Sequence, residues 1–139
     1  MNAVTLAPGD GEGAPLRLDE PLSFWGGLDS TTGRIIDRWH PQSGARIAGR
    51  VLLMPAGRGS SSGSAALAEA LRLGAGPAAI LLLRRDAIVI VGALVAMELY
   101  ARPCPVALVD ERDWAALGAA ARLKVRATPE GASIEARDA

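Results

Sequence analysis

Cysteine and aromatic residues are scarce in this sequence. Cys104 is its single cysteine, which excludes an internal disulfide and any zinc or iron–sulfur site built on cysteine ligands of this chain alone. Aromatic residues make up 4% of the chain although 50% of it is hydrophobic, so alanine, leucine, valine and isoleucine must fill the core. We expect Cys104, between Pro103 and Pro105, to be a small buried residue at the start of a strand.

An excess of charge and a long apolar run are also missing. Fifteen basic and fifteen acidic residues cancel, so the chain has no overall positive field for nucleic acid or a membrane surface. Its longest apolar stretch, residues 78–100, is divided by Arg84, Arg85 and Asp86 into pieces too short to cross a bilayer. The first residues lack the basic start and apolar run of a signal peptide. We therefore expect a soluble cytoplasmic domain without nucleic-acid or membrane partners.

Apolar runs alternate with turn residues and predict one mixed α/β domain over residues 1–139, with a partly parallel sheet. A helix through Leu67 and Leu71 should end at Gly74, and another should run from Asp113 to about Ala121. Alternation on both sides of residues 129–131 predicts a closing hairpin. Further strands are predicted at 16–18, 34–37, 51–54, 78–83, 87–91 and 105–109, although 87–91 could also run directly into a helix that reaches Tyr100.

A loop rich in serine joins the predicted strand at 51–54 to the next helix. It reads Gly-Arg-Gly-Ser-Ser-Ser-Gly-Ser at residues 57–64 and is called the serine loop below. A phosphate-binding P-loop would need Gly-Lys-Ser/Thr, but the first lysine of the chain is Lys124. The G-x-S-x-G pattern of a hydrolase, centred on Ser61, needs a downstream histidine, but the only histidine, His40, lies upstream. Neither catalytic pattern is complete.

Two interpretations of the serine loop remain open. In the first, it is a turn in which Ser62 or Ser64 caps the following helix. In the second, it is the edge of an active site, where two glycines let the backbone approach a ligand and the N–H groups of residues 60–62 point at an anion. A serine there could bind a carboxylate or phosphate. It could also act as a base, because those N–H groups and Arg58 would stabilise its alkoxide.

Three motifs resemble the small subunit of the aconitase X family. Members of that family carry Phe-Trp-Gly-Gly-x-Asp, Thr-Gly-x-Ile-x-Asp-x-x-His-Pro and Gly-Arg-Gly-Ser-Ser, which occur here in order at residues 24–29, 32–41 and 57–61. The resemblance runs from about residue 13 to residue 109, and residues 110–139 form a tail without such a motif. It implies a swivelling β/β/α domain of the aconitase type.

The resemblance also implies a hydro-lyase subunit that is active only with a large subunit. The large subunit holds an iron–sulfur cluster, and this chain alone binds no cofactor. In aconitase the corresponding loop reads Gly-x-Gly-Ser-Ser-Arg-Glu, and its first serine removes a proton next to a carboxylate. That serine corresponds to Ser60, with Arg58, Gly59, Ser61 and Ser62 as substrate-binding residues. Ser62 replaces the aconitase arginine, which argues against citrate as the substrate.

Members of the family dehydrate cis-3-hydroxy-L-proline to a pyrroline carboxylate, or mevalonate 5-phosphate to an anhydromevalonate phosphate. In either reaction Ser60 would take a proton while a cluster iron assists the departure of hydroxide. Arg34, Arg38, Arg46 and Arg58 could bind a phosphate. The arginine-rich, lysine-poor composition is typical of a GC-rich bacterial genome and favours the hydroxyproline. The alternative from another class is a non-catalytic anion-binding or interaction module that uses the serine loop as a nest of N–H groups.

Other motif residues have both a structural and a functional interpretation. His40 could line the site, but a single histidine in a turn is more often structural. Asp29 could cap the turn that follows it or touch the substrate. Phe24 and Trp25 occupy a Gly- and Thr-rich loop and are expected to be exposed, with Trp25 at the interface with the large subunit.

Overall fold

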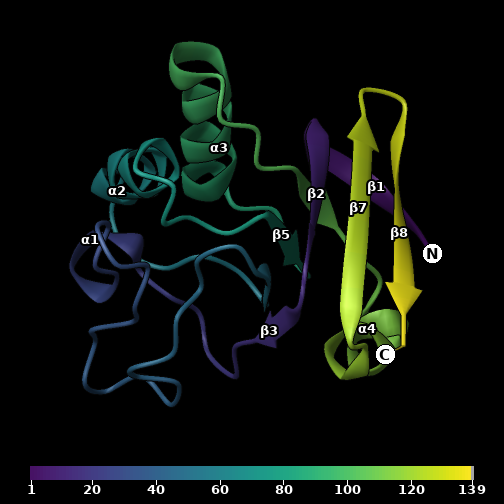
Figure 1. Ribbon diagram of the computed structural model, residues 1–139, viewed down its shortest axis with the longest axis horizontal. Coiled ribbons are helices and arrows are strands. Elements are labelled where there is room, and N and C mark those ends of the chain that lie inside the picture. The colour runs from purple at the N-terminus through teal and green to yellow at the C-terminus, as the bar shows by residue number, and fades with distance from the viewer. Residues whose placement is uncertain (139) are drawn as a thin grey trace.

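A computed structural model describes residues 1–138 and shows three layers, with two helices on one side, parallel strands in the middle and antiparallel strands on the other side (Figure 1). All eight strands belong to one mixed sheet in the order β2-β7-β8-β1-β6-β5-β4-β3. The sheet curls so far that β2, at one end of this order, lies against β4 and β5. The α/β class and the partly parallel sheet expected from the sequence are confirmed.

The parallel half of the sheet carries the serine loop. Its four strands are β3 (Pro15–Arg17), β4 (Val51–Met54), β5 (Ala79–Leu82) and β6 (Val106–Leu108). Every residue of β4 is buried because both faces of the strand are covered. Leu52 and Met54 pack in the core beneath the helices, whereas Val51 and Leu53 pack in the core against the antiparallel strands.

The antiparallel half contains the predicted hairpin, whose strands are β7 (Arg122–Thr128) and β8 (Gly131–Arg137). It also contains β1 (Asn2–Ala7) and β2 (Gly9–Gly13), which the sequence did not predict. The Gly-Asp-Gly-Glu-Gly sequence of β2 has no apolar alternation. Its small residues are needed because a Cβ at Gly11 would overlap the carbonyl oxygen of Ala78, where β2 crosses the parallel strands.

Helices α2 (Ser62–Arg72) and α3 (Ala87–Tyr100) pack against each other and cover the parallel strands. The strand predicted at 87–91 is wrong, because this segment is the first part of α3. The Asp86 carboxylate starts the helix by accepting hydrogen bonds from the N–H groups of Ile88 (3.0 Å) and Val89 (3.2 Å), and this cap overrides the β-branched composition. Within residues 1–138 neither α3 nor any other helix combines the length and apolarity that a membrane span requires.

The remaining elements are short. α1 (Phe24–Gly27) is a kinked turn, in which Phe24 is buried and not exposed as expected, while Trp25 is exposed. The predicted strand at 34–37 is wrong, because this segment forms only isolated bridges. The predicted C-terminal helix is confirmed as η1 (Glu111–Asp113) followed by α4 (Trp114–Ala119).

Candidate active site

The serine loop lies on the surface between β4 and α2, as predicted. It leaves the carboxyl end of β4, and the loop that follows β5 runs beside it, because the N–H groups of Leu83 (3.1 Å) and Arg84 (3.0 Å) both donate to the Pro55 carbonyl. In sheets with parallel strands, ligands bind at this carboxyl edge. The adjacent residues Arg84 and Arg85 are exposed and bring positive charge to the same edge. Their position beside the serine loop was not predicted.

The serine loop presents backbone donors to solvent. Ser60, Ser61 and Ser62 are exposed. The carbonyls of Ser60 and Ser61 accept from the N–H groups of Gly63 (2.9 Å) and Ser64 (3.1 Å), which closes the first turn of α2. Within residues 1–138 the N–H groups of residues 60–62 have no acceptor. Three N–H donors without a partner therefore lie at the positive end of an 11-residue helix, an arrangement suited to an anion.

The capping interpretation of the serines is wrong. Ser61 occupies the N-cap position of α2 but makes no side-chain capping bond. The Ser64 hydroxyl donates instead to the carbonyl of Ile88 at 2.7 Å, which ties the start of α2 to the start of α3. Helix capping therefore does not explain why this loop contains so many serines.

Gly59 fixes the shape of the loop next to Ser60. Its φ is +104°, which L side chains rarely adopt, and a Cβ there would lie 2.5 Å from the hydroxyl oxygen of Ser23. Ser23 is itself held by donating to the Trp25 carbonyl at 2.9 Å. The backbone before Ser60 therefore fits only when residue 59 has no side chain.

Arg58 forms an ion pair that the sequence did not predict. Its Nη2 lies 3.5 Å from Oδ2 of Asp37, and the two side chains are 53% and 24% exposed. The other carboxylate oxygen of Asp37 accepts from the N–H of Trp39 at 3.0 Å. Asp37 therefore orients Arg58 and partly offsets the charge that was expected to stabilise an alkoxide.

The three sequence motifs meet at this point of the surface. Leu22, just before the first motif, forms a bridge with Gly57 of the third. Asp37 of the second motif pairs with Arg58 of the third. The first and second motifs are joined by the bridge between Leu28 and Ile35. Asp86 lies against the same loop, because a Cβ at Gly57 would meet its Oδ2 at 2.9 Å. Of the supporting residues Ser23, Asp37 and Asp86, only Asp37 stood in a motif, so sequence reasoning missed the other two.

His40 and Asp29 have structural roles. His40 is 3% exposed, and its Nε2 lies 3.0 Å from the carbonyl oxygen of Glu20 while its Nδ1 accepts from the Gln42 N–H at 3.0 Å. Both ring nitrogens are therefore used within the fold. Asp29 accepts from the N–H of Thr31 at 2.9 Å, and this hydrogen bond is the main cause of the lowered pKa of Asp29. The structural interpretation is confirmed for both residues.

Replacing His40 with alanine should destabilise the fold without removing a catalytic group. The change removes a buried imidazole ring together with its two hydrogen bonds, to the Glu20 carbonyl and from the Gln42 N–H, and the loss of two such bonds costs about 1–3 kcal/mol. Urea unfolding of the purified chain measures this loss. Trp39→Ala is the matched control, because Trp39 is 87% exposed and its removal should leave the unfolding midpoint in place. Equal midpoints for His40→Ala and the unaltered chain would contradict the structural role.

The residues of this chain do not fit an iron–sulfur cluster. Within residues 1–138 no group of three or more histidine, cysteine, aspartate or glutamate side chains could hold a metal ion. Cys104 is buried two residues before β6, close to the strand start that was expected. Burial raises the pKa of its thiol to about 12, so it stays protonated and is a poor metal ligand.

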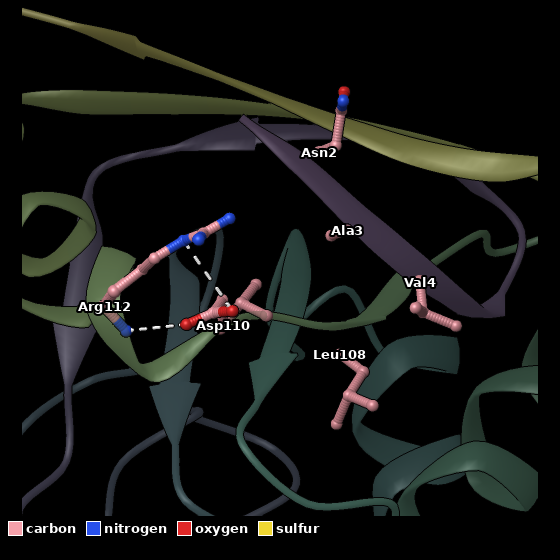
Figure 2. A pocket seen from close by; sticks show the side chains of 7 residues that line it. Asn2, Ala3, Val4, Leu108, Asp110 and Arg112 are labelled. Carbon is pink, nitrogen blue, oxygen red and sulfur yellow. Dashed lines mark hydrogen bonds and ion pairs between the residues drawn. The ribbon is translucent and has the colours of Figure 1, made fainter.

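Three hollows of the surface lie away from the serine loop. One of about 360 Å³ is lined by residues 2–4, residues 108–110 and Arg112 (Figure 2). Its carboxylate, Asp110, accepts from the backbone N–H of Arg112 at 2.9 Å and lies 3.7 Å from the guanidinium Nε. β6 lines this hollow through Leu108, and β5 separates β6 from the strand that carries the serine loop. It therefore offers no group to the candidate site.

Two solved structures share this architecture. Aconitase X of Thermococcus kodakaraensis, solved in its holo-form, superimposes with a TM-score of 0.75 at 28% identity, covering 96% of this chain and 95% of that chain. The solution NMR structure of a UPF0107 protein superimposes with a TM-score of 0.83 at 32% identity over 99% and 98% of the two chains. Together with the three layers, these similarities define a swivelling domain of the aconitase type.

Sequence comparison identifies the family. The family model described as the aconitase X swivel domain matches residues 1–135, including most of the tail that carries no recognised motif. The chain belongs to the aconitase X swivel domain family.

Two kinds of relative match the chain. The cis-3-hydroxy-L-proline dehydratase of Pseudomonas aeruginosa is 47% identical over 108 residues, which are 78% of this chain and 19% of that protein. The phosphomevalonate dehydratase small subunit of Methanothermobacter thermautotrophicus is 44% identical over 96 residues, which are 69% of this chain and 73% of that subunit. The chain thus spans about a fifth of the length of the hydroxyproline dehydratases that it matches.

Proposed function

We propose that this chain is the small subunit of a heteromeric aconitase X-type hydro-lyase, in which Ser60 removes a proton from a hydroxy acid. The observation that carries the proposal is the meeting of three separate motifs around an exposed serine whose neighbouring N–H groups have no acceptor within residues 1–138. Dehydratases among the relatives support the reaction class.

The proposed chemistry of this chain is proton transfer. Oγ of Ser60 takes the proton from the carbon next to the substrate carboxylate, and the electrons of that C–H bond form a double bond to the neighbouring carbon as its hydroxyl group leaves. The N–H groups of residues 60–62 stabilise negative charge, either on the deprotonated serine or on the carboxylate as it gains enolate character. Because these donors belong to a helix end held by the fold, they need not reorganise during the reaction.

Catalysis of the departure of the substrate hydroxyl group is assigned to the large subunit. The loss of this group needs an acid, and the two carboxylates that lie against the serine loop, Asp37 and Asp86, are engaged by Arg58 and by the start of α3. The large subunit is proposed to supply that acid and to hold the iron–sulfur cluster of the enzyme, since this chain has no fitting ligand set among residues 1–138.

The proposed substrate is cis-3-hydroxy-L-proline. It carries one carboxylate, which matches the single group of N–H donors on the serine loop. Two of the four arginines that were expected to bind a phosphate are engaged within the fold. Arg34 donates to the Gly44 carbonyl (3.1 Å), and Arg46 donates to the Thr32 carbonyl (3.0 Å). Identity to the Pseudomonas aeruginosa hydroxyproline dehydratase supports the same choice.

Mevalonate 5-phosphate is the second candidate substrate. The observation that favours it is the pair of exposed arginines, Arg84 and Arg85, that follows β5 beside the serine loop. Arginine binds phosphate through its planar fork of donors. The small subunits of phosphomevalonate dehydratases among the relatives support this alternative.

Dehydration assays test the proposal against a non-catalytic anion-binding module. The chain is co-purified with the large aconitase X subunit of the same organism and supplied with cis-3-hydroxy-L-proline or mevalonate 5-phosphate. We expect turnover of the hydroxyproline by the complex and none by the chain alone. Binding of both compounds without turnover by the complex would favour the module, and turnover by the isolated chain would contradict the division of labour.

Replacing Arg58 with alanine should reduce kcat/KM by about 10- to 150-fold, the equivalent of a hydrogen bond to a charged group. The base stays in place, but the cation beside the serine loop is lost. Arg112→Ala is the matched control, because Arg112 is 82% exposed and lies at η1, away from the loop. Steady-state kinetics of the two variants measure the difference, and equal kcat/KM values would remove Arg58 from the site.

A further inference from the structure

Three large apolar side chains are exposed in the segment between β3 and β4. Trp25 is 64% exposed, Ile36 is 52% exposed and Trp39 is 87% exposed. We call these three residues the tryptophan patch. Their segment forms α1 and the blue loops that extend beyond it in Figure 1. Two of the three tryptophans of the chain thus face solvent in one region, although a Trp side chain buries 150–250 Å² when it is covered.

The backbone that carries the patch is held in place. The N–H of Ile36 donates to the Gly27 carbonyl at 2.9 Å, which joins the two loops that display the patch. Phe24, next to Trp25, is 2% exposed and anchors its loop in the core. Asp37 accepts from the N–H of Trp39 at 3.0 Å. The exposed side chains are therefore presented by a fixed surface.

The tryptophan patch borders the serine loop. Asp37, which stands between Ile36 and Trp39 in the sequence, forms the ion pair with Arg58. Ser23, two residues before Trp25, lies directly against Gly59. A protein that covers the serine loop to complete its chemistry would therefore lie next to the segment that displays the patch.

We propose that the tryptophan patch is the surface on which the large subunit docks, an inference that rests on the proposed function. The relatives support this occupant, because in the hydroxyproline dehydratases this domain is about a fifth of one long chain. The other four-fifths of such an enzyme is available to cover the edge that holds the active serine. Exposed tryptophans beside a polar site have the composition of an interface hot spot surrounded by a polar rim.

Fluorine NMR tests the location of the interface with a control inside the chain. The chain is labelled with 5-fluorotryptophan, and its three resonances are assigned with Trp→Phe variants. Trp114, the third tryptophan, begins α4 and packs against the core of the antiparallel strands, far from the patch in the fold. On titration with the unlabelled large subunit, the Trp25 and Trp39 resonances should shift and lose solvent accessibility, while the Trp114 resonance stays unchanged. If the Trp25 and Trp39 resonances stayed unchanged, or if the Trp114 resonance changed as much as they do, the proposal would be overturned.

Affinity measurements give the second test. Trp25→Ser and Trp39→Ser should each raise the Kd for the large subunit by about 30-fold or more, the loss expected of a hot-spot residue. Both side chains are exposed, so the variants should fold. Leu99→Ser is the matched control, because Leu99 is 67% exposed at the C-terminal end of α3, whereas the serine loop lies at the other end. An unchanged Kd for both tryptophan variants, or an equal loss for Leu99→Ser, would contradict the docking surface.

The two proposals fail in different ways. If the unaltered chain binds the large subunit and supports dehydration while the patch variants bind equally well, only the docking surface is wrong. If the patch variants weaken binding but the saturated complex of the unaltered chain produces no dehydration, only the proposed reaction is wrong. If the unaltered chain does not bind the large subunit, both are overturned.

Discussion

Replacing Ser60 with alanine should abolish dehydration by the complex. The loss should exceed the ~10²–10⁴-fold that general acid–base catalysis contributes, because an alanine methyl group cannot take a proton. Folding should be unchanged, since Ser60 is exposed and its hydroxyl group makes no hydrogen bond within residues 1–138. Steady-state turnover, circular dichroism and the Kd for the large subunit measure these three properties.

The adjacent serines are the matched controls for this change. Ser61 and Ser62 are exposed, and neither hydroxyl group caps α2. Ser61→Ala and Ser62→Ala should therefore keep the stability of the chain and lose turnover within about tenfold, which corresponds to about 1.4 kcal/mol. If Ser61→Ala lost as much turnover as Ser60→Ala, the assignment of the base to Ser60 would be contradicted.

Replacing Gly59 with alanine should have the second-largest effect on activity. The added Cβ would meet the Ser23 hydroxyl at 2.5 Å, and a φ of +104° is strained for any L residue. The loop must shift to relieve this contact, and a displacement of about 1 Å at a reacting group can cost 10²-fold in rate. We expect kcat to fall by about 10²-fold, with a stability loss of about 1–3 kcal/mol.

Gly74→Ala separates strain from catalysis. Gly74 also has a positive φ, +76°, but a Cβ there would have nothing within 4 Å, and the residue lies at the far end of α2 from the serine loop. This variant should lose stability of a similar order and keep its turnover at saturating large subunit. Equal losses of turnover in the two variants would show that general destabilisation, and not the position of Ser60, causes the effect at Gly59.

The sequence predicted the elements in which apolar residues follow a clear pattern. The fully apolar β4 and the alternating hairpin β7–β8 stood out because each strand has a regular burial pattern. α3 was ambiguous because valine and isoleucine favour strands, and its helical form depends on the Asp86 cap and on packing against α2. β2 was missed because the close approach of Gly11 to Ala78 selects glycine in place of a strand-forming residue. A local cap together with helix packing therefore decided α3, and long-range packing decided β2.

The candidate site was predictable in part. The surface position of Ser60 between a strand and a helix followed from local sequence, and the structure bears it out. The ion pair between Arg58 and Asp37 joins residues that only the folded chain brings together, so no spacing could indicate it. Ser23 was missed for the same reason, since its role depends on its contact with Gly59.

Release of deuterium in a single turnover tests the central claim most directly. The substrates cis-3-hydroxy-L-proline and mevalonate 5-phosphate are each deuterated at the carbon that loses its proton, then mixed with an excess of the complex. The account predicts that the unaltered complex releases label from the hydroxyproline into water, and that the complex with Ser60→Ala retains it. Release by the Ser60→Ala complex at a rate near that of the unaltered complex would contradict the account, because the base would then be another residue.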